Sequence, residues 1–254
     1  MSRLSALTCA ALLSIGSARD GVSQGGHAMA VVSPDSIAIA DSIFVRYRVA
    51  NTSPRQAASV VRVSVRAPVA RMDAPTPDWA LERPKADDSL ATWRSKSAAA
   101  DVLPGAFRSG FVLTAASGLP DIVSYWVEGR SEAPPATEAS PGAAQHGPPG
   151  HTVGIAAVSD LSAGALLGRL YNLQIQTCTL GWITNRGDCN SLLNKIAGAR
   201  DEAARNHPQP AAQQLEAFLR QLNGKHSAGA WESVTDNAYW LLRANTEFVI
   251  ARLQ

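Results

Sequence analysis

Apolar and polar residues alternate with a period of two along much of the chain from Val31 to Glu128. This period is typical of half-buried β-strands, whose successive side chains point to opposite faces of a sheet. Turns rich in Pro and Gly separate the alternating runs, and no helical pattern lies between them. The clearest runs are Ile43, Val45, Tyr47 and Val49; Val61, Val63 and Val65; Phe111 and Leu113; and Ile122 to Val127. The pattern predicts an antiparallel β-sandwich rather than a βαβ fold.

The positions opposite these apolar residues carry several arginines, namely Arg46, Arg48, Arg62 and Arg66. We expect them to be solvated strand surface rather than a binding site, because outward-facing strand positions are commonly charged.

The composition changes abruptly between Arg130 and Gly150, where Pro, Ala, Gly and Ser dominate. A stretch of this kind cannot form a packed core, so we expect a mobile loop or linker. Thr152 to Val158 again has an extended character, and we expect it to pair near Ile122–Glu128. The loop at 130–150 then lies inside a single β-domain that covers residues 26–158.

From Ser159 onward the apolar spacing becomes helical and predicts a small antiparallel bundle over residues 159–254. Ser162 suits the N-cap of the first helix, Pro210 the first turn of the third, and Gly224 the end of the third. The core-facing positions are Leu166, Leu170 and Leu173; Leu192, Leu193, Ile196 and Ala199; Leu215, Phe218, Leu219 and Leu222; and Trp231, Val234, Ala238, Leu241, Leu242, Phe248, Val249 and Leu253. The predicted fold class is therefore α+β in two segregated domains.

Four short motifs in the helical half carry a resemblance to a known module. They are Gly181-Trp182-Ile183-Thr184-Asn185-Arg186-Gly187, Ser191-Leu192-Leu193-Asn194-Lys195-Ile196, Leu215-Glu216-Ala217-Phe218-Leu219 and Asn237-Ala238-Tyr239-Trp240-Leu241-Leu242. The stretch from Gly181 to Leu253 resembles the FIMAH-type domain of exported bacterial proteins. A typical member has a longer Gly-Lys stretch followed by Ile, where this chain has Gly224-Lys225-His226-Ser227. The resemblance implies export and an accessory role, without catalytic residues.

The β half carries a more generic resemblance. Its Pro104-Gly105, Gly110-Phe111 and Ser117-Gly118-Leu119-Pro120 elements are similar to turns in immunoglobulin-like modules of exported proteins. This resemblance implies an immunoglobulin-like sandwich and no particular ligand.

Residues 1–18 have the features of a signal peptide. Arg3 provides the positive charge, Leu4 to Ile15 an apolar stretch, and Gly16-Ser17-Ala18 the small residues of a cleavage site. A buried helix is the alternative, and the extreme N-terminal position favours export. We therefore expect an exported protein, located in the periplasm, at the cell surface or outside the cell.

Cleavage at this site would remove Cys9 and leave Cys178 and Cys189 in an oxidising compartment. We expect these two cysteines to form a disulfide. A metal site is the alternative, but it needs more ligands at short spacing, and no histidine lies nearby.

Charge and motifs weigh against several functional classes. A formal charge of +2 is too small for a typical nucleic-acid-binding face, and no apolar run has the roughly 20 residues that span a membrane. Glycine-rich phosphate loops, nucleophile elbows and zinc-binding helices are all missing from the sequence. His146 and His151 lie in a Pro/Gly-rich loop without a nearby thiolate, and Asp87-Asp88 lacks the pattern of a calcium loop. We expect no cofactor, no metal and no catalytic residues.

Three further features suggest binding. Trp79 lies in a Pro-rich stretch, where an exposed indole can stack on a sugar ring, although packing in the core or loop is favoured. Arg186-Gly187-Asp188 spells an integrin-binding tripeptide, and Asn51-Thr52-Ser53 spells a glycosylation sequon. Tripeptides recur by chance, so neither carries a prediction.

These observations favour a non-catalytic binding or structural module, with a cell-envelope polysaccharide or an exported protein as partner. The alternative is a secreted polysaccharide- or peptide-processing hydrolase whose carboxylates, such as Asp78, Asp87 and Asp121, converge only on folding. A third hypothesis, an inhibitor or chaperone-like partner, predicts an exposed apolar patch on the bundle.

Overall fold

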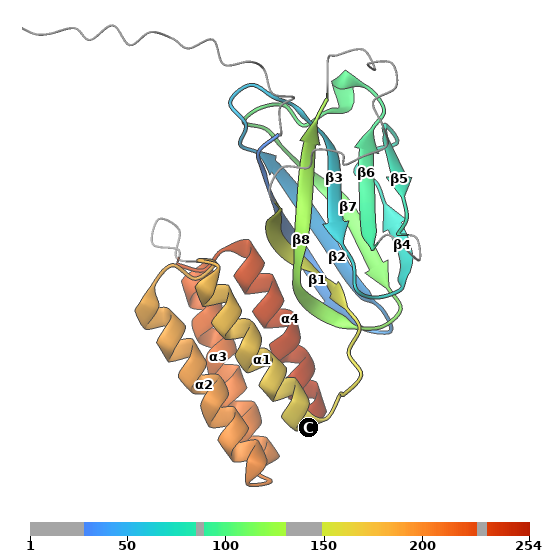
Figure 1. Cartoon of the computed structure of the whole chain (residues 1–254). Coiled ribbons are helices and arrows are strands. Elements are labelled where there is room, and N and C mark those ends of the chain that lie inside the picture. The colour runs from blue at the N-terminus through green and yellow to red at the C-terminus, as the bar shows by residue number, and fades with distance from the viewer. Residues whose placement is uncertain (1–27, 85–88, 131–148, 228–232) are drawn as a thin grey trace, which may run out of the picture.

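The structure is a computed structural model that describes residues 28–84, 89–130, 149–227 and 233–254. These residues form a two-sheet β-sandwich followed by four helices (Figure 1). The predicted α+β class with segregated sheet and helical parts is confirmed. The expected signal peptide and nearly all of the loop expected at 130–150 lie outside the described residues.

The first sheet has the strand order β1-β2-β7-β4 and the second has the order β5-β6-β3-β8-β9. All pairings between these neighbouring strands are antiparallel. The strands are β1 (Ala30–Ile39), β2 (Ile43–Asn51), β3 (Ala58–Ser64), β4 (Val69–Asp73), β5 (Trp79–Glu82), β6 (Leu90–Ser95), β7 (Phe107–Ala115), β8 (Leu119–Gly129) and β9 (Gly150–Ala156). A short 3₁₀ helix, η1 (Ala98–Ala100), lies between β6 and β7.

This order is that of an immunoglobulin-like sandwich, in which one sheet runs A-B-E-D and the other contains C, F and G. Strands β1, β2, β7 and β4 occupy the A, B, E and D positions, and β3, β8 and β9 occupy the C, F and G positions. Strands β6 and β5 extend the second sheet, as the extra strands of variable-type domains do. In this chain, however, the D-position strand β4 comes before the two additional strands β5 and β6 in the sequence.

The alternating residues of the sequence fill the space between the sheets. Val45, Tyr47 and Val49 of β2 are fully buried, whereas the intervening Arg46 and Arg48 are exposed. Tyr47 and Phe111 each meet the ring of Trp93 edge-on, with centroid separations of 6.1 and 5.9 Å. The period-two pattern therefore identified the inner faces correctly.

Strand β9 returns to the sheet beside β8, as the sequence predicted. Its register extends from Leu119↔Ala156 to Tyr125↔Gly150. The turn into β8 requires Gly118, whose φ is +119° and whose hypothetical Cβ would lie 2.4 Å from the carbonyl oxygen of Ala156.

The helices are α1 (Ala163–Thr179), α2 (Arg186–Ala204), α3 (Pro208–His226) and α4 (Asp236–Leu253). Ser162 caps α1 as predicted, because its side chain accepts a hydrogen bond from the backbone N–H of Ala165. Among the described helices, none is both long and apolar enough to cross a membrane.

Two predicted helix boundaries were wrong. Helix α3 continues through Gly224 to His226, where Lys225 reaches Asp188 and His226 reaches Asp236. These contacts offset the roughly 1 kcal/mol that glycine costs inside a helix.

Helix α4 starts at Asp236 rather than near Trp231, which lies outside the described residues. Val234 is not helical because it forms a β-bridge with Ile183. Thr235 then caps the helix through its side chain.

Helix α4 packs against the sandwich beside β1, β8 and β9 (Figure 1). Strands β1 and β9 are the edges of their sheets, so α4 covers the side where two edges meet. Leu119, Ile122 and Val153 of β8 and β9 belong to the same hydrophobic cluster as the helices. The sheet and helical parts therefore share a core.

Two buried polar contacts fix this docking. The side-chain amide of Asn245 in α4 donates to the carbonyl oxygen of Pro120 at 3.0 Å, and it also donates to Leu241 within its own helix. The hydroxyl of Thr152 in β9 donates to Oδ1 of Asn237 at 3.2 Å. Because all of these side chains are buried, separation of the two parts would leave polar groups to be rehydrated along with apolar surface.

The substitution Leu119→Ala should lower the free energy of unfolding by about 2–5 kcal/mol, because Leu119 is 1% exposed within the shared core. Urea unfolding followed by pulsed hydrogen–deuterium exchange should show sandwich and bundle peptides opening at one shared midpoint, lowered in the variant. Leu103→Ala is the control, since Leu103 is 59% exposed and its loss should change stability by under about 0.5 kcal/mol. Separate midpoints for sheet and helices in the wild-type protein would contradict a shared core.

Candidate functional site

The structure contains the predicted disulfide between Cys178 and Cys189, whose Cα atoms are 6.0 Å apart. It joins the last turn of α1 to the first turn of α2. The enclosed loop pairs with the segment before α4, since Thr184 N–H donates to Ser233 and Thr235 N–H donates to Trp182, both at 2.9 Å. The disulfide therefore holds the end of the bundle at which α2 and α4 begin.

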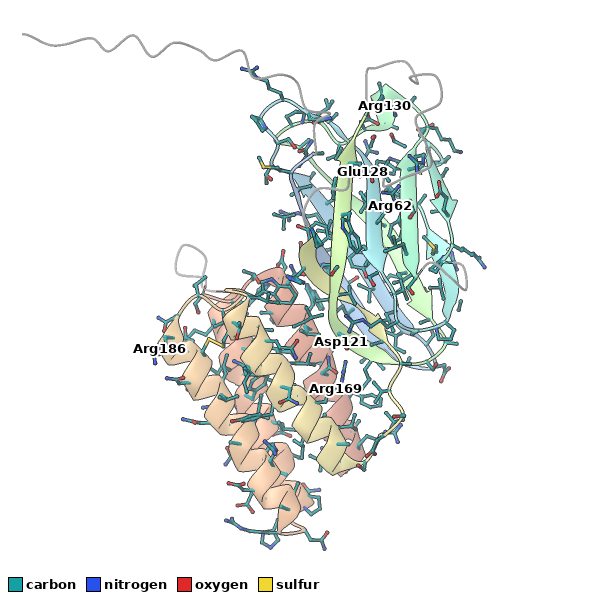
Figure 2. All side chains as sticks on the ribbon, viewed as in Figure 1. Arg62, Asp121, Glu128, Arg130, Arg169 and Arg186 are labelled. Carbon is teal, nitrogen blue, oxygen red and sulfur yellow. A yellow bond between two sulfur atoms is a disulfide. The ribbon has the colours of Figure 1, made fainter. Side chains whose placement is uncertain are left out.

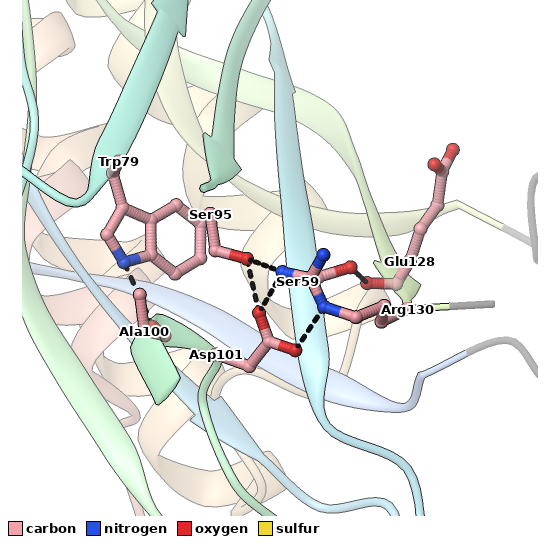
Figure 3. Close-up of polar contacts among 7 residues, drawn as sticks. All are labelled: Ser59, Trp79, Ser95, Ala100, Asp101, Glu128 and Arg130. Carbon is pink, nitrogen blue, oxygen red and sulfur yellow. Dashed lines mark hydrogen bonds and ion pairs between the residues drawn. The ribbon is translucent and has the colours of Figure 1, made fainter. Parts of the chain in front are cut away.

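The stacking hypothesis for Trp79 is corrected by the structure. Trp79 begins β5, is 3% exposed and packs edge-on against Phe111 at 5.0 Å between ring centroids. Its indole N–H donates to the carbonyl oxygen of Ala100 (Figure 3). Neither face of the ring is available to a sugar, because the alternation of β5 directs this side chain into the core.

Close to Trp79, an ion pair between the exposed Arg130 and the buried Asp101 anchors the end of β8. Arg130 donates through two nitrogens to the two carboxylate oxygens of Asp101, at 2.9 and 3.0 Å, and also to the hydroxyl of Ser95 (Figure 3). The hydrogen bond to Asp101 outweighs desolvation and raises the pKa of Arg130. Because this guanidinium is already satisfied by a buried carboxylate, the cluster is structural.

The two tripeptide motifs are occupied by internal contacts. Asn51 is 2% exposed, and its amide donates to the carbonyl oxygens of Gln56 and Val102, so it offers no nitrogen to a glycan. Asp188 of the Arg-Gly-Asp motif is 8% exposed and accepts a hydrogen bond from Ser233 at 2.7 Å. Its other oxygen lies 2.9 Å from Nζ of Lys225. Asp188 therefore ties α2 to α3 and to the segment before α4.

The structure does not bring the candidate hydrolase carboxylates together. Asp78 is exposed in the turn before β5, at the far edge of the second sheet from β8. Asp121 lies near the start of β8 and pairs with Arg169, whereas Asp87 lies outside the described residues. Within the described ranges, no group of three His, Cys, Asp or Glu side chains is placed to hold a metal ion.

The helical surface offers little apolar area to a partner protein. Of the large apolar side chains that are exposed in the described residues, Ile175 is the one that lies within a helix. Met29, Val31, Leu81, Leu103 and Phe107 lie on the sandwich. The observed distribution therefore does not support the inhibitor or chaperone-like hypothesis.

A cleft of about 440 Å³ lies where the sandwich meets the bundle, and we refer to it as the junction cleft. Its lining residues come from the segment just after β3, from β8, from β9 and from α1, and they are Arg66, Asp121, Ile122, Val123, Ser124, His151, Arg169, Asn172, Leu173 and Gln176. Figure 2 shows Asp121 on β8 and Arg169 on α1 at this boundary. The volume falls within the range of small-molecule sites.

Secondary structure explains how these side chains meet. Arg169, Asn172, Leu173 and Gln176 lie at positions i, i+3, i+4 and i+7 of α1, which form one helical face. On the sheet, Ser124 of β8 is the cross-strand partner of His151 of β9. The backbone of Arg66 bonds to Ile155 and Ala157, and these bonds hold it beside the end of β9.

Arg169 is positioned by the sandwich. One terminal nitrogen donates to the carbonyl oxygen of Pro120 at 2.8 Å, and the other lies 3.4 Å from the carboxylate of Asp121. Its Nε is buried and has no hydrogen-bond partner in the structure. Arg66 and His151 are exposed, and no ion pair engages either side chain within the described residues. The lining of the junction cleft therefore contains two guanidinium groups, those of Arg66 and Arg169, and one carboxylate, that of Asp121.

A second cavity of similar size, between α1 and α2, is built largely from small apolar residues. Its charged lining residues are Asp201 and Arg200, and the Arg200 guanidinium stacks over the Tyr171 ring at 4.8 Å from the centroid. It lies within the bundle alone and offers fewer groups for recognition than the junction cleft.

No pattern in the sequence pointed directly to the junction cleft. Its residues come from four separated segments, and Arg66 was expected to be ordinary solvated strand surface. The one available signal was the polar stripe Arg169, Asn172 and Gln176 beside the apolar face of α1, which by itself is typical of any exposed helix face.

Comparisons with known proteins give a family match for the helical part and a similar solved structure. A model of the FIMAH domain matches residues 175–251. The other half is similar to an uncharacterized protein from Nocardia farcinica whose crystal structure reveals an immunoglobulin-like fold, with 19% sequence identity and a TM-score of 0.33. That match covers 51% of this chain and 98% of the other. No curated protein matches the chain.

The contacts of Asp188 predict a pH-dependent contribution to stability. Burial by itself would raise the pKa of Asp188, but the hydrogen bonds from Ser233 and Lys225, with the charge of Lys225, outweigh it and lower the pKa. A lowered folded-state pKa stabilises the protein above the unfolded value of about 3.9, and this stabilisation is lost as the pH falls through the folded pKa. Asp188→Asn should therefore cost about 1–3 kcal/mol at pH 7 and progressively less below pH ~4.

Urea unfolding of both proteins between neutral and acidic pH measures this difference. The matched control is Asp201→Asn, since Asp201 is an exposed aspartate of the same helix and should give little change at any pH. A stability difference for Asp188→Asn that stays constant down to acidic pH would show that its charge does not stabilise the fold.

Proposed function

We propose that this protein is an exported, non-catalytic binding module whose ligand site is the junction cleft. The observation that carries the proposal is that this polar cleft is lined from both parts of the chain, by β8 and β9 on one side and α1 on the other. Neither part alone provides the site. The packing of the bundle against the sandwich is therefore what forms the proposed ligand site.

An exported location is supported by the disulfide. Structural disulfides persist in oxidising compartments and are rare in the cytosol of most organisms. The Cys178–Cys189 bond closes the loop of the FIMAH-matched region. The partner we propose is a cell-envelope polysaccharide, because hydroxyl, amide and imidazole groups such as those of Ser124, Asn172, Gln176 and His151 suit a ligand rich in hydroxyl groups.

The chemistry of the junction cleft favours binding over hydrolysis. Glycoside hydrolysis needs two carboxyl groups that flank the bond to be cleaved. The lining of this cleft contains one carboxylate, Asp121, and Arg169 already neutralises it. Ser124 and His151 are cross-strand neighbours, but no hydrogen bond joins their side chains within the described residues, as a base-activated nucleophile would require.

The substitution Asn172→Trp tests the proposal, because Asn172 is an exposed helical residue of the cleft and an indole there would fill it. Purified protein should be retained on an insoluble cell-envelope polysaccharide fraction, and the variant should be retained at least about tenfold more weakly. Gln213→Trp is the matched control, since Gln213 is exposed on α3 and does not line the junction cleft. Circular dichroism of both variants should match the wild type.

Equal retention of Asn172→Trp and Gln213→Trp would show that the junction cleft is not the binding site. Retention of the wild type on no envelope fraction would contradict the binding function itself.

A further inference from the structure

The charges of the junction cleft point to the chemical class of the ligand. We propose that it binds an acidic polysaccharide, whose carboxylate or sulfate group is held by Arg66 with Arg169. This inference rests on the proposed function and specifies what the site recognises.

Arg66 lies just beyond β3 and differs from three other arginines in or beside the second sheet. Arg62 pairs with Glu128, Arg94 with Glu82 and Arg130 with Asp101. Arg66 borders the junction cleft, and its guanidinium has no carboxylate partner within the described residues. Isolated exposed arginines are common on protein surfaces, but this one lies at a cleft that already contains a second, positioned guanidinium.

Arg169 supplies that second group in a fixed orientation. Its contacts with Pro120 and Asp121 immobilise the side chain before any ligand arrives, which reduces the entropy lost on binding. Its buried Nε still lacks an acceptor. This nitrogen is inaccessible, so a ligand would meet the terminal nitrogens instead, each of which carries a second N–H on a side chain that is 21% exposed.

The rest of the lining fits a sugar better than an isolated anion. Ser124, Asn172 and Gln176 supply donors and acceptors for the hydroxyl groups of a sugar, whereas Ile122 and Leu173 are buried, at 9% and 2% exposed, and add little accessible apolar surface. Guanidinium groups bind planar carboxylates through paired hydrogen bonds. No helix N-terminus of the described residues borders the cleft, since α1 contributes from Arg169 onward, six residues beyond its start at Ala163. The site therefore lacks the backbone-amide cradle that binds small phosphates.

Titration calorimetry with defined oligosaccharides tests this inference on the full mature chain. Oligogalacturonate and its methyl ester share the same sugar rings and differ in charge, and dextran sulfate with neutral dextran forms a second such pair. Each acidic probe supplies one of the two candidate groups, carboxylate or sulfate. The test variant is Arg66→Gln. The control is Arg55→Gln, which removes the same charge from an exposed residue in the turn between β2 and β3 that does not line the cleft.

At least one acidic probe should bind about tenfold or more tightly than its neutral counterpart, and Arg66→Gln should remove about tenfold of that affinity. Arg55→Gln should leave the affinity unchanged, and added salt should weaken the binding of the acidic probe. Asn172→Trp should abolish binding of the same probe.

Two results would overturn the inference. Equal affinity for charged and neutral probes, with binding lost only in Asn172→Trp, would show that the junction cleft binds a ligand but does not recognise an anionic group. Binding of neither acidic probe would also exclude an acidic ligand, and retention on envelope fractions would then decide the proposed function separately.

Discussion

The packing of α4 against the edge strands β1 and β9 is the contact on which the rest of the structure depends. It covers the side where the two sheets end, and it joins Leu119, Ile122 and Val153 to the core of the helices. Asn245 and Asn237 then satisfy buried polar groups of the sandwich, so the docking is specific as well as hydrophobic. Because α1 packs beside α4 in the bundle, the same contact places the polar face of α1 opposite β8 and creates the junction cleft.

The boundary of the FIMAH match has a consequence for function. The match begins at residue 175, inside α1, whereas Arg169, Asn172 and Leu173 precede it and the remaining cleft residues except Gln176 belong to the sandwich. The proposed site is therefore a property of how this chain attaches its helical module.

Local patterns were sufficient to predict the elements and the disulfide, because alternation, capping by Ser162 and cysteine spacing act over short distances. Gly224 and Val234 were misassigned because tertiary contacts override local preference: Lys225 finds Asp188, and Val234 bridges to Ile183. Trp79 was considered as a ligand platform, yet its position in β5 directs it into the core. The junction cleft could not be predicted, since it depends on the docking of helices against one particular sheet edge, which no local pattern encodes.

The sandwich and the helices are proposed to form a single ligand site between them. Hydrogen–deuterium exchange of the full chain, with and without a retained envelope polysaccharide, tests this claim most directly because it reports each segment separately. We expect slower exchange on ligand addition in two peptides together, one covering β8 from Leu119 to Tyr125 and one covering α1 from Arg169 to Gln176. Protection confined to the sandwich or to the helices alone would contradict a shared site.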